Sequence, residues 1–468
     1  MSEGRFGLII LGGGTAAFAA AIKAEELGVK TAMISDGPLG GTCVNVGCVP
    51  SKHLLAVGDN VFYPKRPLFK AVGKAQPQFD FKAAIEEKDE IVGRLQEENY
   101  KNVLGKMEKV IFYKGKGKFV SKNEVKVNDK LFKSDKFIIA TGAKTLITPL
   151  EGIGEIDYLT NIEALSLTEI PESMIVIGGR SLGLEFAQMY AHFGTQVTVL
   201  QRSQRILPNE EPEISEALKK YLEEEGIIIH TGVEVKNIKK EDKYKIVTAQ
   251  VGGGHRKIKG ERLLMATGMS PNTKYLELEK AEVEVDERGF VKVNEQMRTT
   301  APHIWAAGDV AGGLLLETVA AKEGAFAAAN ALEDAKKTIN YQTVPHAVFT
   351  SPQVASVGLT EAELTEMLGV CSCRTVPMNR VPKARVVKDI RGLVKMVINP
   401  KNFKIAGVHI LAPLAADMIH EATLAVKFGL TIDEIIDTVH VFPTSSEAIK
   451  LAAQSFKRDL NKMSCCVE

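Results

Sequence analysis

The sequence predicts an α/β chain made of two similar strand–turn–helix–strand units and a C-terminal α+β domain. Near the N-terminus an apolar strand runs into a glycine-rich turn, an alanine-rich helix and a second strand. The same order of elements recurs about 165 residues later, from Gly12 to Gly178. No turn of this kind occurs beyond about Tyr341. Because 468 residues exceed what one hydrophobic core supports, we expect two to three domains.

The first unit reads GLIILGGGTAAFAAAIKAEELGVKTAMISD over residues 7–36. Gly12, Gly14 and Ala17 occupy the positions of the G-x-G-x-x-G/A fingerprint of a Rossmann fold. Its small residues allow backbone amides to approach a pyrophosphate at the N-terminus of the helix. The unit therefore predicts a dinucleotide site.

The second unit reads SMIVIGGRSLGLEFAQMYAHFGTQVTVLQRS over residues 173–203, with Gly178 and Gly183 in fingerprint positions and Arg180 in place of the middle glycine. A single fingerprint is weak evidence, and two unrelated strand–helix turns are the alternative. Two complete units in one chain favour two Rossmann-like nucleotide-binding domains.

The residues after the strand QVTVL bear on the choice of nucleotide. Gln201 stands where an NAD site usually has an acidic residue for the ribose hydroxyls, and Arg202 and Arg205 follow. Guanidinium groups suit a 2′-phosphate, which favours NADPH over NAD. The alternative is a pair of solvated surface arginines.

Three further apolar strands end in small residues: FIIATGA (residues 137–143), LLMATGMSPNT (263–273) and IWAAGDVAGG (304–313). Such ends suit a close approach of the backbone to a cofactor, and we assign Thr141, Gly142 and Gly268 to cofactor binding.

The segment GGTCVNVGCVPSK places Cys43 and Cys48 on either side of four small or polar residues. Pro50 suits the first turn of a helix, and a helix N-terminus stabilises a thiolate. Two buried structural cysteines are the alternative. Their pairing between glycines, just after a nucleotide-binding unit, favours a redox-active pair.

Composition excludes several other classes of function. The formal net charge is +1, which argues against a nucleic-acid or membrane surface. No stretch has the length of a membrane span and the N-terminus does not resemble a signal peptide, so we expect a cytoplasmic protein. Six cysteines in such a chain indicate redox or metal chemistry.

From Leu8 to its last residues, the chain resembles the FAD-dependent pyridine nucleotide-disulfide oxidoreductases, a family that includes glutathione reductase, lipoamide dehydrogenase and mercuric reductase. The cysteine segment is the most specific part of the match. The resemblance implies FAD in the first unit, a nicotinamide nucleotide in the second and a homodimer with active sites at the subunit interface. The implied parts are FAD binding over 1–149 and 272–338, NADPH binding over 150–271, dimerisation over 339–458 and a flexible tail over 459–468.

The same resemblance implies roles for individual residues. Cys48 would face the flavin, Cys43 would meet the substrate, and Lys52 would pair with Glu185 near the reacting flavin edge. The implied FAD contacts are Thr42, Asp309, Glu317, Gly37 and Asp36, the last standing one position beyond the usual place of the ribose-binding acid.

The segment HVFPTSSEAIKLAAQSF bears on the electron acceptor. Disulfide reductases of this family carry His-Pro-Thr with a glutamate three residues later, and the His–Glu pair protonates the departing thiol. Here Thr444 and Glu447 are present, but Phe442 takes the place of the histidine. His440 lies two residues earlier and would reach differently. The missing acid favours a soft metal ion as acceptor.

The chain ends in NKMSCCVE, and Cys465 and Cys466 are adjacent. Neighbouring cysteines close a strained disulfide, so such a pair favours the dithiol, which suits a soft metal. With KLAAQSFKRDLNKMSCC, the end of the chain resembles the mercuric reductase branch of the family, although no Cys-x-x-Cys metal-binding domain precedes the first unit. That resemblance implies Hg(II) as substrate, with Cys43, Cys48, Cys465 and Cys466 as its ligands, and a role for Tyr158.

Two other functions remain open from the sequence. A large-type thioredoxin reductase also uses a C-terminal cysteine pair, as a relay to an external disulfide, but Phe442 opposes it. A flavoprotein that only sequesters soft metals is the non-enzymatic alternative. Cys371 and Cys373 lie on one face of an expected strand and read as small, partly buried residues, with a further metal site as the alternative.

Overall fold

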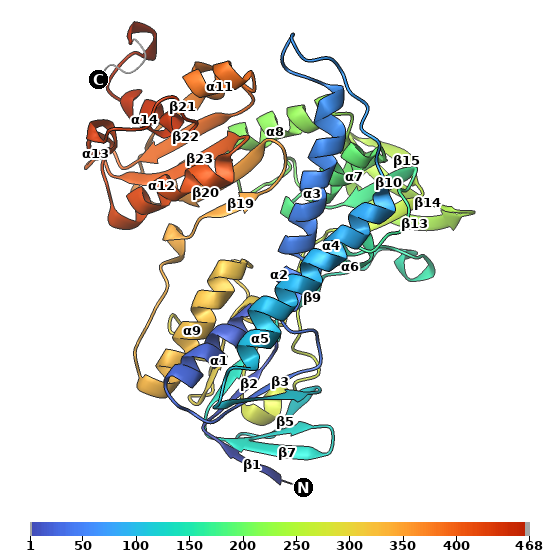
Figure 1. The fold of residues 1–468 in the computed structure, drawn as a ribbon, viewed down its shortest axis with the longest axis vertical. Coiled ribbons are helices and arrows are strands. Elements are labelled where there is room, and N and C mark those ends of the chain that lie inside the picture. Colours follow the sequence, from blue (N-terminus) through green and yellow to red (C-terminus); the bar gives the residue numbers. More distant parts are fainter. Residues whose placement is uncertain (1, 464–468) are drawn as a thin grey trace. The chain divides into compact units, whose positions relative to one another are not determined.

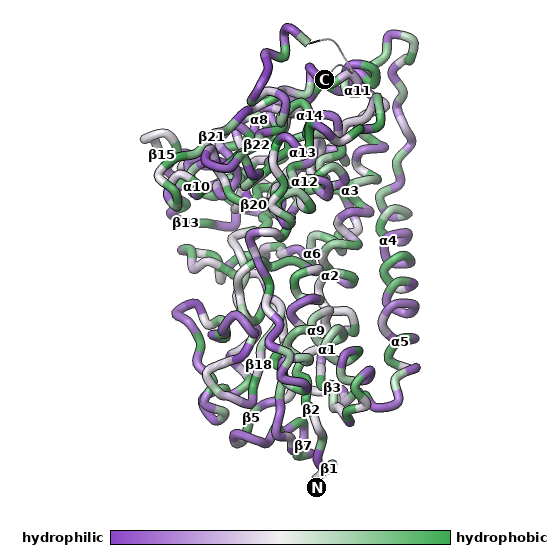
Figure 2. Tube along the Cα trace, turned by 90° about the vertical axis from the view of Figure 1, so that its left-hand side faces the viewer, coloured by the Kyte–Doolittle hydropathy of each residue, from purple (hydrophilic) through white to green (hydrophobic). Residues whose placement is uncertain are grey.

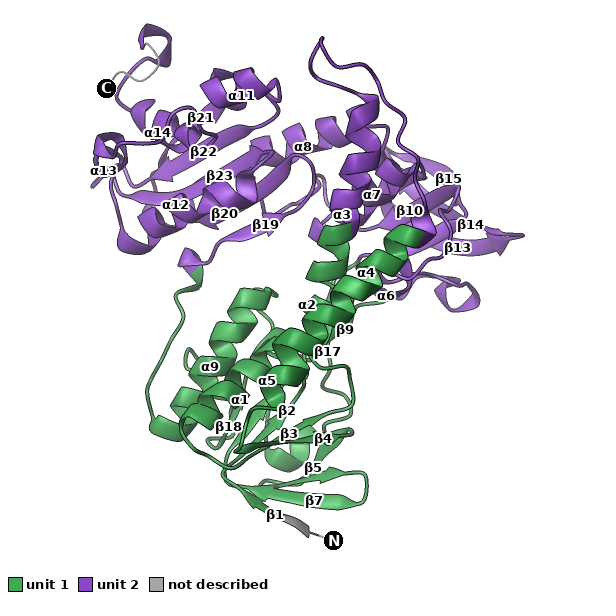
Figure 3. Cartoon of the chain, in the orientation of Figure 1, with its two compact units in different colours: residues 1–53, 83–147, 267–341 green, residues 54–82, 148–266, 342–468 purple. Residues whose placement is uncertain are grey.

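The computed structural model describes residues 2–463, and the chain divides into two compact units (Figure 3). Unit 1 comprises residues 1–53, 83–147 and 267–341, and unit 2 comprises residues 54–82, 148–266 and 342–468. The chain passes from one unit to the other within helices α3 (Cys48–Phe62) and α4 (Phe81–Gln96). Apolar and polar residues alternate along α4, as Figure 2 shows.

A five-stranded parallel sheet forms the centre of unit 1 (Figure 1). Its strand order is β18 (Ile304–Ala306), β8 (Phe137–Ile139), β2 (Leu8–Leu11), β3 (Thr31–Ser35) and β4 (Val110–Lys114). Strands β18, β8, β2 and β3 are short apolar runs buried on both faces, as is typical of parallel sheets, whereas the edge strand β4 is largely exposed or half buried.

Helices α1 (Thr15–Glu26) and α9 (Glu317–Glu333) pack against each other and share one core with the sheet. Their alanines allow the two backbones to come very close: a Cβ atom on Gly324 would lie 2.0 Å from the carbonyl oxygen of Ala16. The other face of the sheet shares a core with the sheet β1 (Ser2–Phe6), β7 (Lys130–Ser134), β6 (Glu124–Val127) and β5 (Gly117–Ser121).

Unit 2 contains the second parallel sheet. Its order is β12 (Ile228–His230), β11 (Gln196–Leu200), β10 (Ser173–Ile177) and β16 (Arg262–Met265), and helix α7 (Ser181–Phe193) follows β10. An antiparallel sheet of β13 (Glu234–Glu241), β14 (Tyr244–Val251) and β15 (Gly254–Gly260) is inserted before β16.

The C-terminal part of unit 2 is an antiparallel sheet of order β19 (His346–Val348), β20 (Gln353–Gly358), β23 (Ile405–Ala412), β22 (Leu393–Ile398) and β21 (Ser372–Pro377). Helices α12 (Ala415–Phe428), α13 (Ile432–Asp437) and α14 (Glu447–Gln454) contribute to its core. The predicted class, two Rossmann-like domains and a C-terminal α+β domain, is confirmed.

The remaining helices are α2 (Gly41–Val46), α5 (Asn102–Leu104), α6 (Asn161–Ala164), α8 (Pro212–Glu224), α10 (Glu361–Leu368) and α11 (Pro382–Val387), all of them short except α8. The remaining strands, β9 (Ala143–Thr145) and β17 (Met269–Pro271), pair with each other. Among the described helices, none combines the length and apolar character that a membrane span requires.

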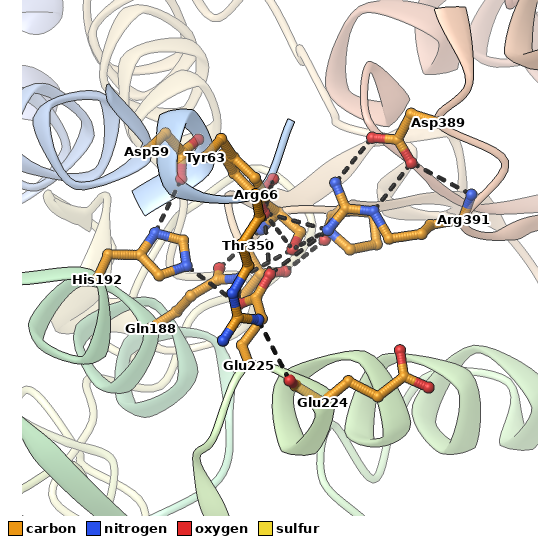
Figure 4. A network of polar contacts seen from close by, with 12 residues as sticks. Asp59, Tyr63, Arg66, Gln188, His192, Glu224, Glu225, Thr350, Asp389 and Arg391 are labelled. Atoms are coloured by element: carbon orange, nitrogen blue, oxygen red, sulfur yellow. Dashed lines mark hydrogen bonds and ion pairs between the residues drawn. The ribbon is translucent and has the colours of Figure 1, made fainter. Parts of the chain in front are cut away.

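A buried polar network joins α3, α7 and the end of α8 within unit 2 (Figure 4). His192 on α7 lies 3.1 Å from the carboxylate of Asp59 and 3.0 Å from that of Glu225. Tyr63 donates a hydrogen bond of 2.9 Å to Glu225, and Arg391 lies 3.5 Å from the same carboxylate. Each buried charge therefore faces an opposite charge or a hydrogen-bond donor, which burial requires.

Candidate active site

A cavity of about 540 Å³ opens in unit 1 at the carboxyl ends of β2, β3, β8 and β18. This edge of a parallel sheet is where Rossmann-like folds bind their ligands, and the volume is typical of a cofactor site. The cavity is lined by eleven of the residues that the sequence assigns to cofactor or catalysis: Gly12, Gly14, Asp36, Gly37, Thr42, Cys43, Cys48, Thr141, Gly142, Asp309 and Glu317.

The turn between β2 and α1 forms one wall of the cavity. Gly12 has a φ of +144°, and a Cβ atom there would lie 2.1 Å from the carbonyl oxygen of Ala140. Gly14 caps α1 without any side-chain hydrogen bond, and the first turn of the helix carries no acidic residue. The first backbone amides of α1 are thus available to an anion, as a pyrophosphate requires. Ala17 is fully buried and serves helix packing.

Carboxyl groups also line the cavity. Burial, together with the charge of Glu317, raises the pKa of Asp309 to about 6. Glu317 accepts a hydrogen bond from the hydroxyl of Thr15 on α1. Asp36 lies 3.6 Å from Lys116 and is half exposed. The amides of α1 and these carboxyl groups fit the phosphates and the hydroxyl groups of a bound FAD.

Cys43 on α2 and Cys48 at the first position of α3 are both free thiols. A hydrogen bond between the two sulfurs lowers the pKa of Cys48 and raises the pKa of Cys43. The positive charge of Lys52 also lowers the pKa of Cys48, against the effect of burial. Cys48 is therefore the more acidic thiol of the pair and Cys43 the hydrogen-bond donor, as the position of Cys48 at a helix N-terminus favours.

Three predicted residues lie away from this cavity lining. Lys52 is a half-buried residue of α3 in unit 1. Glu185 is buried on α7 in unit 2, where its carboxylate accepts a 2.9 Å hydrogen bond from the amide of Phe349. Tyr158 is half buried before α6, also in unit 2. The pairing of Lys52 with Glu185 and the role of Tyr158 stay predictions.

Gly268, which the sequence also assigns to cofactor binding, has a φ of +119°, and its carbonyl accepts a hydrogen bond from the amide of Leu146.

The second fingerprint builds a similar turn in unit 2. A Cβ atom on Gly178 would lie 2.1 Å from the carbonyl oxygen of Ala266, and one on Gly183 would lie 2.0 Å from that of Gly178. Helix α7 begins here with no side-chain cap and no acidic residue in its first turn. Its free amides suit the pyrophosphate of a nicotinamide nucleotide.

Gln201 has a role that its sequence position does not reveal. Its buried side chain accepts a 2.8 Å hydrogen bond from the amide of Gly179, so it braces the turn itself. Arg202 is exposed beside it. The Nε atom of Arg205 is shielded from solvent and has no hydrogen-bond partner among the described residues. Two guanidinium groups next to this turn, one with an unused donor, fit the 2′-phosphate of NADPH.

In the C-terminal segment, both ring nitrogens of His440 have partners, so this ring is not free to act as an acid. Its Nε2 atom lies 2.7 Å from Glu421 on α12, and its Nδ1 atom lies 2.8 Å from the carbonyl oxygen of Thr438. Phe442 is half exposed. The buried Oε2 atom of Glu447 has no hydrogen-bond partner among the described residues, and burial raises the pKa of this carboxyl. The sequence could not reveal Glu421, because nothing in its own segment marks it.

Cys465 and Cys466 lie outside the described residues. Among residues 2–463, no group of three or more His, Cys, Asp or Glu side chains is arranged to hold a metal ion.

The sequence pattern of the family described as pyridine nucleotide-disulphide oxidoreductase matches residues 6–324, and the pattern of its dimerisation domain matches residues 344–453. The chain therefore belongs to the pyridine nucleotide-disulfide oxidoreductases. It is a flavoprotein oxidoreductase that uses FAD and NADPH, which agrees with the two turns described above.

Within this family the chain is similar to mercuric reductases. It is 40% identical to the mercuric reductase of Streptomyces lividans, over 98% of each chain, and 39% identical to that of Staphylococcus aureus, over 99% of this chain and 85% of the other. The dihydrolipoyl dehydrogenase of Thermus scotoductus is 36% identical, over 97% of this chain and 98% of the other.

Among solved structures, the fold is similar to a Cu(II) complex of the HOCl-induced flavoprotein disulfide reductase RclA from Escherichia coli. The two chains superpose with a TM-score of 0.87 at 28% identity, over 97% of this chain and all of the other.

Proposed function

We propose that this protein is an NADPH-dependent mercury(II) reductase, which detoxifies Hg(II) in the cytoplasm by converting it to volatile Hg(0). The observation that carries the proposal is Phe442. It stands where a disulfide reductase of this family needs a proton donor, and the nearest histidine, His440, is held by Glu421 and Thr438. The similarity to mercuric reductases along the whole chain supports the same conclusion.

The reaction converts NADPH and Hg(II) into NADP⁺, a proton and Hg(0). Bound FAD supplies the redox group through which two electrons pass from the nicotinamide to the site of Cys43 and Cys48. Cys48 holds its proton weakly and binds the metal as a thiolate, while Cys43 gives up its proton when the second sulfur–mercury bond forms. Lys52 stabilises the negative charge on Cys48. Two thiolates suit a soft cation better than any other side chains.

The remaining predicted residues complete this proposal. Cys465 and Cys466 take Hg(II) from solution thiols and pass it to Cys43 and Cys48, and Tyr158 lies beside the metal during the exchange. Lys52 pairs with Glu185 near the flavin.

A homodimer places the tail of one subunit at the site of the other. Unit 2 carries exposed apolar side chains that a second copy would cover: Leu424, Phe428, Val439 and Val441, which are 55%, 68%, 88% and 77% exposed.

Reduction of a dithiol substrate's disulfide is the second candidate. Glu447 favours it, because a carboxyl whose pKa is raised by burial can donate a proton to a departing thiol. The similarity to a dihydrolipoyl dehydrogenase points the same way.

One comparison separates the two functions: NADPH oxidation by the purified holoenzyme with Hg(II) and excess glutathione, set against oxidised thioredoxin and oxidised lipoamide. We expect sustained NADPH oxidation with Hg(II) and glutathione, and none with oxidised thioredoxin or oxidised lipoamide. Turnover with a disulfide and none with Hg(II) would overturn the proposal. The Phe442→His variant is the matched control, because it restores the missing acid and should gain disulfide turnover from the same flavoprotein.

A further inference from the structure

Cys373 is the second residue of the edge strand β21 in unit 2 and Cys371 directly precedes the strand, outside the site described above. Cys373 pairs with Val397 on β22, and Thr375 pairs with Lys395. Because side chains of a strand alternate between its two faces, Cys373 and Thr375 share the face opposite the core side of the sheet, where Val394 and Met396 are buried. Both cysteines are half-buried free thiols.

The two thiols converge on one carboxylate. The sulfur of Cys371 lies 3.8 Å from Glu361 at the start of α10, and the thiol of Cys373 is hydrogen-bonded to the same side chain. The side chain of Glu361 is 42% exposed, so solvent reaches this corner of the sheet. An ion can enter here without any change in the fold.

The surroundings carry excess negative charge. The buried ammonium group of Lys395 lies 2.9 Å from Glu211, 2.9 Å from Glu213 and 2.7 Å from Glu361. Three carboxylates around one cation leave an excess of two negative charges beside the thiols. Such a surface attracts a cation and opposes ionisation of a thiol, and burial together with Glu361 raises the pKa of Cys373 to about 12.

The spacing admits a bridging metal. Cys371 directly precedes β21 and Cys373 is the second residue of the strand, so their Cα atoms are at most about 7 Å apart, within reach of a disulfide and of a sulfur–metal–sulfur bridge. A linear sulfur–metal–sulfur bridge is longer than a sulfur–sulfur bond and fits this separation. Even with Glu361 the pair offers three possible ligands, and among the described residues no such group is arranged to hold a metal ion, so an ion that needs four ligands, such as Zn²⁺, is not held.

We propose that Cys371 and Cys373 form a second binding site for a soft, two-coordinate cation, and that Hg(II) is the ion it takes. On binding, two S–H bonds break, two S–Hg bonds form and two protons leave to water. No electrons are transferred, so the site stores the ion without reducing it. The proposal does not depend on reductase activity.

The test uses the full-length holoenzyme with Cys43, Cys48, Cys465 and Cys466 all replaced by serine. Of the six cysteines, this variant keeps only Cys371 and Cys373. It is treated with mercuric chloride and excess glutathione, passed through a desalting column and analysed for mercury and flavin. We expect one mercury per chain, and none after Cys371→Ser and Cys373→Ser are added. The Thr375→Ala change, on the same face, should leave the mercury content unchanged.

Two results would overturn the proposal. One is a variant with full flavin content and two titratable thiols that retains no mercury against glutathione. The other is a single-cysteine variant that retains as much mercury as the pair. If replacing four cysteines prevents folding, the wild-type chain is compared with its Cys371→Ser/Cys373→Ser variant. We expect the wild type to retain one more mercury per chain than this variant and both to oxidise NADPH at the same rate.

Discussion

Two neighbouring side chains favour the thiolate form of Cys48. Cys43 gives it a hydrogen bond and Lys52 a nearby positive charge, and both favour the ionised form over the effect of burial. The charge of Glu317 opposes ionisation of both thiols. The two cysteines thus differ in proton affinity although they lie in one motif.

Removal of the hydrogen-bond donor tests this division of roles. In a Cys43→Ala variant we expect the pKa of Cys48 to rise, because its thiolate loses a hydrogen bond, and its alkylation by iodoacetamide at neutral pH to slow roughly tenfold, since a hydrogen bond to a charged group contributes about 1.5–3 kcal/mol. Cys43→Ser keeps a donor and serves as the control. Equal alkylation rates in the two variants would show that the charge of Lys52 alone holds the thiolate.

Each nucleotide-binding turn depends on glycine for a reason that its neighbours define. At Gly12 the backbone is left-handed and the carbonyl of Ala140 leaves no room for a Cβ atom. At Gly14 the conformation is ordinary, and a Cβ atom would lie 3.5 Å from Gly41, an acceptable contact. The first glycine therefore serves the fold, and the second leaves space at the amides of α1.

The variants Gly12→Ala and Gly14→Ala should fail in different ways. Gly12→Ala should lower the thermal midpoint of the apoprotein, because strain of about 1–2 kcal/mol adds to a clash with backbone. Gly14→Ala should leave the apoprotein's midpoint unchanged and weaken FAD binding in a titration of apoprotein with flavin. Normal FAD affinity in Gly14→Ala would contradict the placement of the pyrophosphate at α1.

Among the helices of unit 2, His192 joins α7 to α3 and to the end of α8. Its ring stacks on Phe62 with centroids 4.1 Å apart, and it lies between two carboxylates. Burial alone would lower its pKa, but the contacts with Asp59 and Glu225 outweigh it and the pKa is raised. The charged imidazole is therefore the form that unit 2 stabilises (Figure 4).

This linkage gives a pH dependence with a definite sign. A histidine whose pKa is raised on folding stabilises fully below its unfolded value, about 6.5, and loses that contribution as the pH rises through the folded value. We expect the half-life of the wild type at elevated temperature to exceed that of His192→Asn by a factor that shrinks as the pH rises above 6.5. A factor that grows with pH would contradict a charged His192.

At the scale of the molecule, sequence patterns predict features of fixed local spacing, namely the two fingerprints and the cysteine motif, because their spacing reflects local geometry. They do not predict partners that folding brings together. Gln201 occupies the position that selects the nucleotide, yet it braces the amide of Gly179. His440 contacts Glu421 on helix α12, and the Cys371–Cys373 pair contacts Glu361 at the opposite end of helix α10 in the sequence.

The proposed dimer predicts complementation between two inactive proteins. Cys43→Ser/Cys48→Ser keeps the tail, and Cys465→Ser/Cys466→Ser keeps the redox pair. If each tail serves the other subunit, co-expressed mixed dimers contain one intact site and should recover up to about half the mercury turnover per dimer in the presence of glutathione, as two equivalent sites become one. Mixed dimers no more active than their parents would indicate that each tail serves its own subunit.

The central claim is that the electrons of NADPH end on mercury, and the vapour above the reaction tests it most directly. Holoenzyme, NADPH, Hg(II) and excess glutathione are combined in a closed vessel, and Hg(0) in the headspace is measured alongside NADPH oxidation. We expect one Hg(0) to be released for each NADPH consumed. NADPH consumption with no mercury vapour, and with electrons appearing in reduced glutathione or another thiol, would contradict it.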